Sequence, residues 1–140
     1  MLALMNELHP GGVRMVRPVR SVVLALGVLA GAAHVGAALA QAPAKVSEGV
    51  LTNGTGMTLY FFDRDTPGKS ACNGPCANSW PPFAAGADAK PSADWTVITR
   101  EDGSKQWAYK GKPLYTWAKD QKPGEKTGDN FNNVWHVATP

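Results

Sequence analysis

The stretches LYFFDRD (residues 59–65) and LYTWAKD (residues 114–120) repeat one order of residue types. Each has a leucine and a tyrosine, an aromatic residue two positions on, and a closing aspartate. Four kinds of residue recur at the same step of 55 positions: Tyr60 and Tyr115, Asp65 and Asp120, Trp80 and Trp135, Gly56 and Gly111. A single register held across four residue types indicates an internal duplication.

Residues 1–40 have the features of a secretory signal peptide. Three arginines precede an apolar run that ends in Ala-Leu-Ala (38–40), the small-x-small pattern that signal peptidase recognises. We therefore expect cleavage before Gln41. Glycines and a histidine interrupt the run, whereas a membrane span needs about 20 consistently apolar residues. The polar segment in front is unusual for a signal peptide, so we expect the true start at Met15.

Removal of this segment changes the charge of the chain. It takes away three arginines and one glutamate, so 14 basic and 11 acidic residues become 11 and 10, a net charge of +1. Binding to nucleic acid needs clustered basic residues against phosphates, so the composition does not favour a nucleic-acid partner. Residues 41–140 are enough for one small domain, which we expect to be monomeric.

The sequence after residue 41 has the pattern of a β protein. Short runs rich in β-branched and aromatic residues are separated by turn pairs, and no window has the apolar period of a helix. We predict an all-β fold, a small β-meander or sandwich, built from two pseudo-symmetric repeats at about 50–83 and about 105–138 with long ordered loops. The predicted turns are Asn53-Gly54, Asp102-Gly103 and Lys110-Gly111.

Alternation along the predicted strands separates the side chains into two faces. It places Leu59 and Phe61 on one face and the neighbouring aromatic residues on the other. We expect the second face to form an aromatic stripe that the two halves share, and we favour a core over an exposed binding surface. The residues given this structural role are Tyr60, Phe62, Asp65, Trp80, Tyr115, Trp117, Asp120 and Trp135.

Asp65 and Asp120 each stand where a predicted strand ends. A carboxylate in this position commonly accepts backbone N–H bonds and fixes the next turn. Such bonds favour the charged form, so we expect the pKa of both carboxyl groups to lie below the ordinary value.

These residues carry a resemblance to a known family. The pattern Tyr-x-aromatic-x-x-Asp stands at 60–65 and 115–120, followed by CNGPCANSWPPF (72–83) and VWHV (134–137). From about Val50 to Val137 the chain closely resembles the bacterial secreted-repeat family described as predicted lipoproteins with a Yx(FWY)xxD motif. The resemblance implies a secreted location and a duplicated architecture but no reaction. No cysteine follows the apolar run to accept a lipid, so we expect a periplasmic or secreted product without a lipid anchor.

Cys72 and Cys76 are expected to form a disulfide, because a secreted chain meets an oxidising compartment. Closing so short a loop stabilises by about 2 kcal/mol. The C-x-x-x-C spacing is not that of a redox pair, and His136 is the single histidine left to complete a metal site. At the step of 55 the cysteines correspond to Thr127 and Phe131, so an apolar residue stands where the second repeat lacks the covalent link.

Three classes of function remain open from sequence. We favour a non-enzymatic envelope module, without a cofactor, that binds a partner protein, a glycan or a small ligand. The alternative is a periplasmic redox or metal-handling protein that uses Cys72, Cys76 and His136 with Asp65. A hydrolase using Asp63 and Asp65 has less support, because acids two positions apart are common in turns. Asp63, Asp65 and His136 are the candidate metal ligands, none of which we favour.

Overall fold

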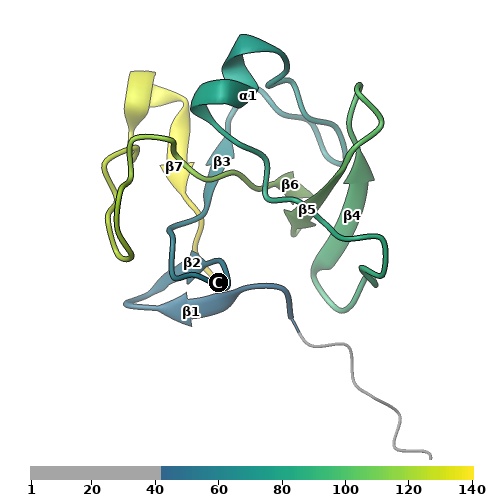
Figure 1. Cartoon of the computed structure of the whole chain (residues 1–140), viewed down its shortest axis with the longest axis horizontal. Helices are drawn as coiled ribbons and strands as arrows, with labels where there is room; N and C mark the ends of the chain where they lie inside the picture. The colour runs from purple at the N-terminus through teal and green to yellow at the C-terminus, as the bar shows by residue number, and fades with distance from the viewer. Residues whose placement is uncertain (1–41) are drawn as a thin grey trace, which may run out of the picture. The chain divides into compact units, whose positions relative to one another are not determined.

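The computed structural model describes residues 42–140, so the predicted signal peptide and its cleavage point lie outside the described residues. Short strands dominate this part of the chain (Figure 1), as the sequence predicted. None of its helices is long and apolar enough to cross a membrane. The elements are β1 (Lys45–Ser47), β2 (Val50–Thr52), β3 (Tyr60–Phe62), α1 (Pro75–Ser79), β4 (Trp95–Thr99), β5 (Lys105–Tyr109), β6 (Lys112–Pro113), the 3-10 turn η1 (Phe131–Asn133) and β7 (Trp135–Val137).

The strands form three small antiparallel sheets, β1-β2, β3-β7 and β4-β5-β6. Consecutive strands make up the first and the third, whereas β3 and β7 are far apart in the sequence. The predicted turns at 102–103 and 110–111 connect β4 to β5 and β5 to β6. The first hairpin was not predicted. Its turn lies at Glu48-Gly49, where both residues have positive φ. The predicted turn at Asn53-Gly54 is present after β2, where the chain returns antiparallel through the bridge between Thr52 and Thr58. The Asn53 side chain accepts the N–H groups of Thr55 and Met57 there.

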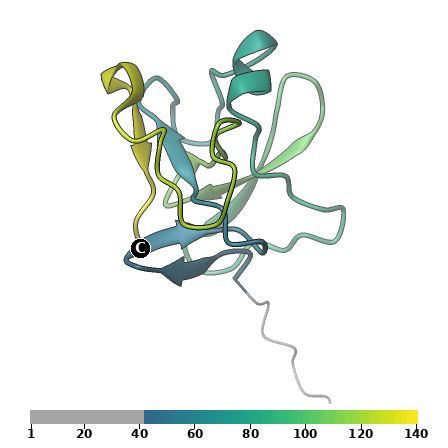
Figure 2. The same ribbon diagram turned by 60° about the vertical axis from the view of Figure 1, so that its left-hand side comes forward.

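The tryptophan segment of each repeat pairs with the tyrosine strand of the other repeat. β3 runs antiparallel to β7, with Phe62 opposite Trp135 (Figure 2). In the second half, Pro82 bridges Tyr115, and the N–H of Thr116 donates to the carbonyl of the residue before Pro82 at 2.9 Å. The two repeats therefore exchange strands, and neither is a separate folding unit.

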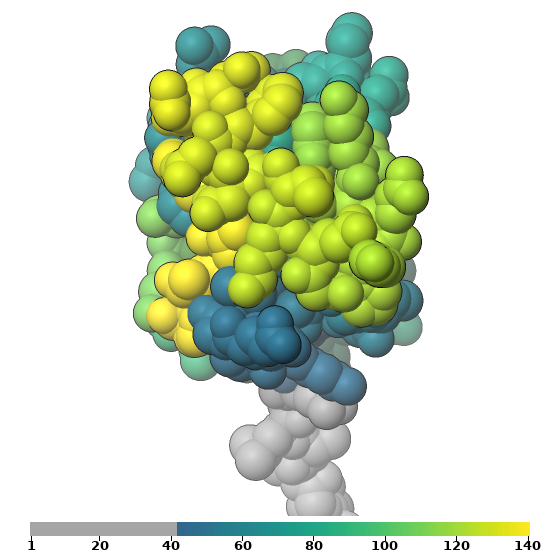
Figure 3. Space-filling view, turned by 90° about the vertical axis from the view of Figure 1, so that its left-hand side faces the viewer, coloured from purple at the N-terminus to yellow at the C-terminus, as the bar shows by residue number. Residues whose placement is uncertain are grey.

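The two halves meet at the tyrosines. The N–H of Tyr60 donates to the carbonyl of Tyr115 at 2.8 Å, and the reverse bond is 2.9 Å. The two hydrogen bonds are reciprocal, since each tyrosine donates its N–H to the carbonyl of the other. A pseudo-twofold axis therefore passes between these residues. The segments that follow Tyr115 cover one face of the domain beside the β1-β2 hairpin (Figure 3).

Two clusters of buried side chains lie on opposite faces of these strands, as alternation along LYFF and LYTW requires. The first cluster is aliphatic and aromatic, and Phe61 packs against it. Phe62 packs against the second, which is almost wholly aromatic. The first contains Ala44, Leu51, Leu59, Trp95, Trp107, Leu114 and Ala138, and the second contains Tyr60, Cys72, Trp80, Tyr115, Trp117 and Trp135.

A stack of four rings crosses the second cluster. Trp80 and Trp135 lie face to face at its centre, with ring centroids 3.8 Å apart and planes 3° from parallel. Trp117 stacks on the outer face of Trp80 at 4.0 Å, and Phe62 stacks on Trp135 at 4.3 Å. Gly128 lies against this stack, and a Cβ there would come within 2.6 Å of Trp80. The stack therefore needs glycine at this position.

Truncation of a central ring should destabilise the domain strongly. Trp80 is 3% exposed and contacts two stacked rings. We expect Trp80→Ala to lower the free energy of unfolding by about 3–5 kcal/mol, measured by urea denaturation. Phe131→Ala is the control, because Phe131 lies at the edge of the same cluster and is 37% exposed. Equal losses from the two variants would contradict a buried stack.

Candidate functional site

Each motif tyrosine donates its hydroxyl to the aspartate of the other repeat. The hydroxyl of Tyr60 donates to Asp120 Oδ2 at 2.6 Å, and that of Tyr115 donates to Asp65 Oδ2 at 2.6 Å. The second oxygen of each carboxylate holds its own loop. Asp65 accepts the N–H of Ala71 at 2.7 Å, and Asp120 accepts that of Thr127 at 3.0 Å. The backbone bonds are of the kind that the sequence indicated, whereas nothing in the sequence pointed to the crossed tyrosines.

Burial changes the acidity of these groups. It raises the pKa of Tyr60 and of Tyr115 well above the ordinary value of 10.0, and the hydrogen bonds to the aspartates act in the same direction. The pKa of Asp65 is also raised, because burial outweighs the bonds from Tyr115 and Ala71 that favour the carboxylate. The prediction of a lowered pKa at Asp65 is therefore wrong, since it counted the hydrogen bonds but not the loss of solvent.

A buried arginine joins the two repeats and was missed from sequence. Arg100 is 6% exposed and donates to the carbonyl of Cys72 at 2.6 Å, to Gln106 Oε1 at 2.7 Å and to Ser70 Oγ at 2.9 Å. Ser70 in turn bonds the hydroxyl of Tyr115. The arginine thus connects the end of β4 to the cysteine loop and to a crossed pair. A single arginine after a predicted strand does not indicate from sequence alone that its side chain is buried and joins other segments.

The predicted disulfide between Cys72 and Cys76 is present, with Cα atoms 5.2 Å apart. Cys72 is fully buried, and α1 begins inside the loop that the bond closes. In the second repeat, the position equivalent to Cys76 is occupied by Phe131, which packs on Trp117 at 4.9 Å between ring centroids. Cys72 therefore lies in the packed interior, and the partly buried Cys76 bonded to it packs against the same cluster.

The candidate metal ligands are divided between two places. His136 Nε2 lies 2.7 Å from Asp63 Oδ2 on the surface, whereas Asp65 binds Tyr115. Across residues 42–140 the structure brings together no group of three His, Cys, Asp or Glu side chains that could hold a metal ion. The two acids proposed for a hydrolase thus have separate partners, and the structure gives no support to a joint role.

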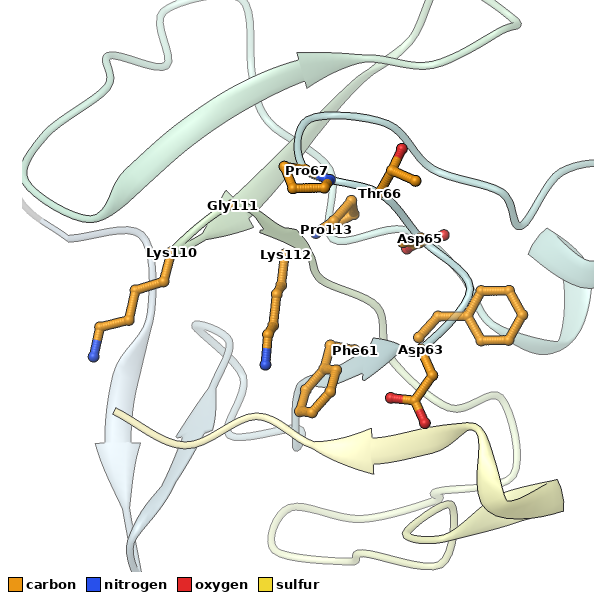
Figure 4. A pocket seen from close by; sticks show the side chains of 10 residues that line it. Phe61, Asp63, Asp65, Thr66, Pro67, Lys110, Gly111, Lys112 and Pro113 are labelled. Atoms are coloured by element: carbon orange, nitrogen blue, oxygen red, sulfur yellow. The ribbon is translucent and has the colours of Figure 1, made fainter.

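A hollow of about 250 Å³ lies where β3 leads into the loop after it and faces the turn between β5 and β6 (Figure 4). We call it the Phe61 pocket. Lys110 and Lys112 extend from the turn toward the same side, and Lys112 Nζ lies 4.1 Å from the centre of the Phe61 ring. Its lining residues are Phe61, Phe62, Asp63, Asp65, Thr66, Pro67, Lys110, Gly111, Lys112 and Pro113.

A second hollow of about 150 Å³ adjoins the first. Phe61, Lys110 and Lys112 line both, so the two hollows share one wall. Leu114 and Ala138 add apolar surface to the second. The two hollows thus combine ammonium groups with apolar surface. Lys110 was predicted from sequence only as part of a turn, and nothing in the sequence marked either lysine as a binding residue.

The fold and the motif define a duplicated, strand-exchanged β domain of the secreted type. Two segments of the chain, residues 44–84 and 96–139, match the family Lipoprotein_15, described as a secreted repeat of unknown function. The chain belongs to this family, as the motif residues indicated. No curated protein and no solved structure matches it.

Removal of a tyrosine hydroxyl that bonds the aspartate of the other repeat should change both the stability at neutral pH and its loss at alkaline pH. Tyr60→Phe leaves Asp120 with one donor fewer, and we expect it to cost about 2 kcal/mol at neutral pH. A tyrosine with a raised folded pKa contributes stability that is complete below pH 10 and is lost as the pH rises further. Urea denaturation between pH 8 and about pH 11 should therefore show a shallower alkaline loss for Tyr60→Phe than for the wild type. Tyr109→Phe, outside the two pairs, should retain the wild-type stability at neutral pH.

The raised pKa of Asp65 predicts an acid response opposite to that of a salt-bridged carboxylate. The stability linked to its protonation is complete below the unfolded value of 3.8 and is lost as the pH rises through the higher folded pKa. As the pH falls from 7 toward about 4, the wild type should gain stability relative to Asp65→Asn. Chemical denaturation of both proteins at several pH values measures this difference. A loss of wild-type stability relative to Asp65→Asn as the pH falls would show that the pKa of Asp65 is lowered instead.

Proposed function

We propose that this secreted repeat domain is a non-enzymatic binding module of the bacterial cell envelope, periplasmic or secreted and without a lipid anchor. The observation that carries the proposal is the Phe61 pocket, where two ammonium groups face a hollow beside an aromatic ring. Of the partners considered from sequence, a small ligand suits a hollow of this size better than a glycan or a protein surface does.

The carboxylate of Asp65 and the sulfur of Cys72 are already bonded within the domain, which supports a binding role over a catalytic one. A general acid or base must reach the substrate, yet Asp65 is bonded to Tyr115 and to its own loop. A redox role would need accessible thiols, whereas Cys72 is buried in a disulfide. The alternative redox or metal-handling function therefore draws no support from this arrangement.

Recovery of an unchanged ligand tests the proposal. The purified domain, immobilised and incubated with a small-molecule extract of the secreting bacterium, should retain a compound that mass spectrometry identifies as chemically unaltered. Phe61→Thr, which introduces the residue found at the equivalent position of the second repeat, should retain less of it. Consumption of a compound with catalytic turnover would reject the non-enzymatic role.

A further inference from the structure

The duplication provides an internal comparison for the Phe61 pocket. Gly111 in its wall corresponds to Gly56 in the other half, and both have a positive φ near +80°. A Cβ on Gly111 would lie 3.8 Å from Pro67, whereas one on Gly56 would lie 3.0 Å from Pro123. The turn and the proline loop that faces it are thus packed more closely in the half without the lysines.

The residues that line the pocket differ between the halves, although the residues of the core recur. At the step of 55 four of the six charged or aromatic lining residues are replaced by uncharged, non-aromatic ones, whereas Phe62 and Asp65 correspond to Trp117 and Asp120. The replacements are Thr55 for Lys110, Met57 for Lys112, Thr116 for Phe61 and Ala118 for Asp63. Because the other half keeps the positive φ at Gly56 and the paired tyrosine at Tyr115 with these substitutes, the duplicated motif does not require the pocket side chains. Ligand binding accounts for the presence of side chains that the fold does not need.

The lysines are available to an anion. Among residues 42–140, the carboxylate of Asp63 pairs with His136, and neither Lys110 nor Lys112 forms a salt bridge. Aromatic rings lie beside the ammonium groups instead, Phe61 beside Lys112 and Tyr109 beside Lys110, the latter at 5.1 Å. A ring face attracts a cation without neutralising its charge, so both ammonium groups retain the capacity to bind an anion.

Part of the wall around the charges is apolar. Pro67 and Pro113 border the larger hollow beside the polar residues Asp63, Asp65 and Thr66. Leu114 and Ala138 border the adjoining one. A fully hydrated inorganic anion would leave these surfaces unused, whereas a hydrocarbon body attached to a carboxylate would cover them.

We propose that the Phe61 pocket binds a small organic carboxylate with an apolar body, whose carboxylate lies between Lys110 and Lys112. This inference rests on the proposed binding function and adds the chemical class of the ligand. The hydrocarbon part contacts Phe61 and the proline walls. Binding weakens as salt is added, because the lysines are exposed.

Titration of the isotope-labelled mature domain with benzoate tests the inference. Benzoate should shift the amide signals of Phe61, Lys110 and Lys112 in nuclear magnetic resonance spectra in a saturable manner. Benzamide has the same ring without the charge, and acetate has the charge without the ring, so both should bind more weakly. Equal affinity for benzoate and either control compound would overturn the proposal, as would shifts at other residues alone.

Matched variants separate this site from general charge effects. Lys112→Met introduces the residue that the other half carries at the same place, Met57, so the fold should be retained. It should weaken benzoate binding by about fivefold, the upper range for an exposed ion pair. Lys90→Met removes the same charge from an exposed position outside the pocket and should leave the affinity unchanged. Identical affinities for the wild type and Lys112→Met would overturn the proposal.

The ligand class and the binding function can be overturned separately. If benzoate does not bind but the domain retains an unaltered, uncharged ligand from the extract, the carboxylate assignment is wrong and the binding function stands. If a retained compound is instead consumed, the binding function is wrong whatever the result with benzoate.

Discussion

The crossed hydrogen bonds between tyrosine and aspartate are the constraint on which the rest of the structure depends. A buried hydroxyl needs a partner, and each motif tyrosine finds it in the other repeat. Because the same aspartate also holds its own loop, a change at Asp65 or Asp120 affects both the interface between the halves and the path of the chain toward its tryptophan. The ring stack then lies where those two loops return, with Trp80 against Trp135.

Much of this arrangement follows from sequence, and the part that does not has a specific physical reason. The step of 55 predicted the duplication, alternation predicted the two faces around Leu59 and Tyr60, and the secreted context predicted the disulfide. Strand exchange could not be predicted, because two copies of one motif offer each strand two equivalent partners. Arg100 and the raised pKa of Asp65 depend on burial, which requires the coordinates of the surrounding chain.

Duplication also separates the demands of stability from those of recognition. The tyrosines, aspartates and tryptophans must recur in both halves. Each tyrosine bonds the aspartate of the other half, and the two central tryptophans stack on each other. Outer positions such as Lys112 and Met57 carry no such reciprocal contact, so one half is free to change there while the other preserves the fold. The candidate pocket combines such free positions with recurring residues, Asp65 among them, which suits a site built on a rigid scaffold.

Strand exchange has a consequence for the order of folding. β3 ends at Phe62, yet its partner β7 does not begin until Trp135. Contacts between distant parts of a sequence form slowly, and unpaired apolar strands are prone to aggregate in the meantime. A chain that crosses a membrane with its amino end first delivers β3 long before β7. The domain therefore cannot complete the β3-β7 sheet until β7 has crossed, and the aromatic strand must be kept from other chains throughout that interval.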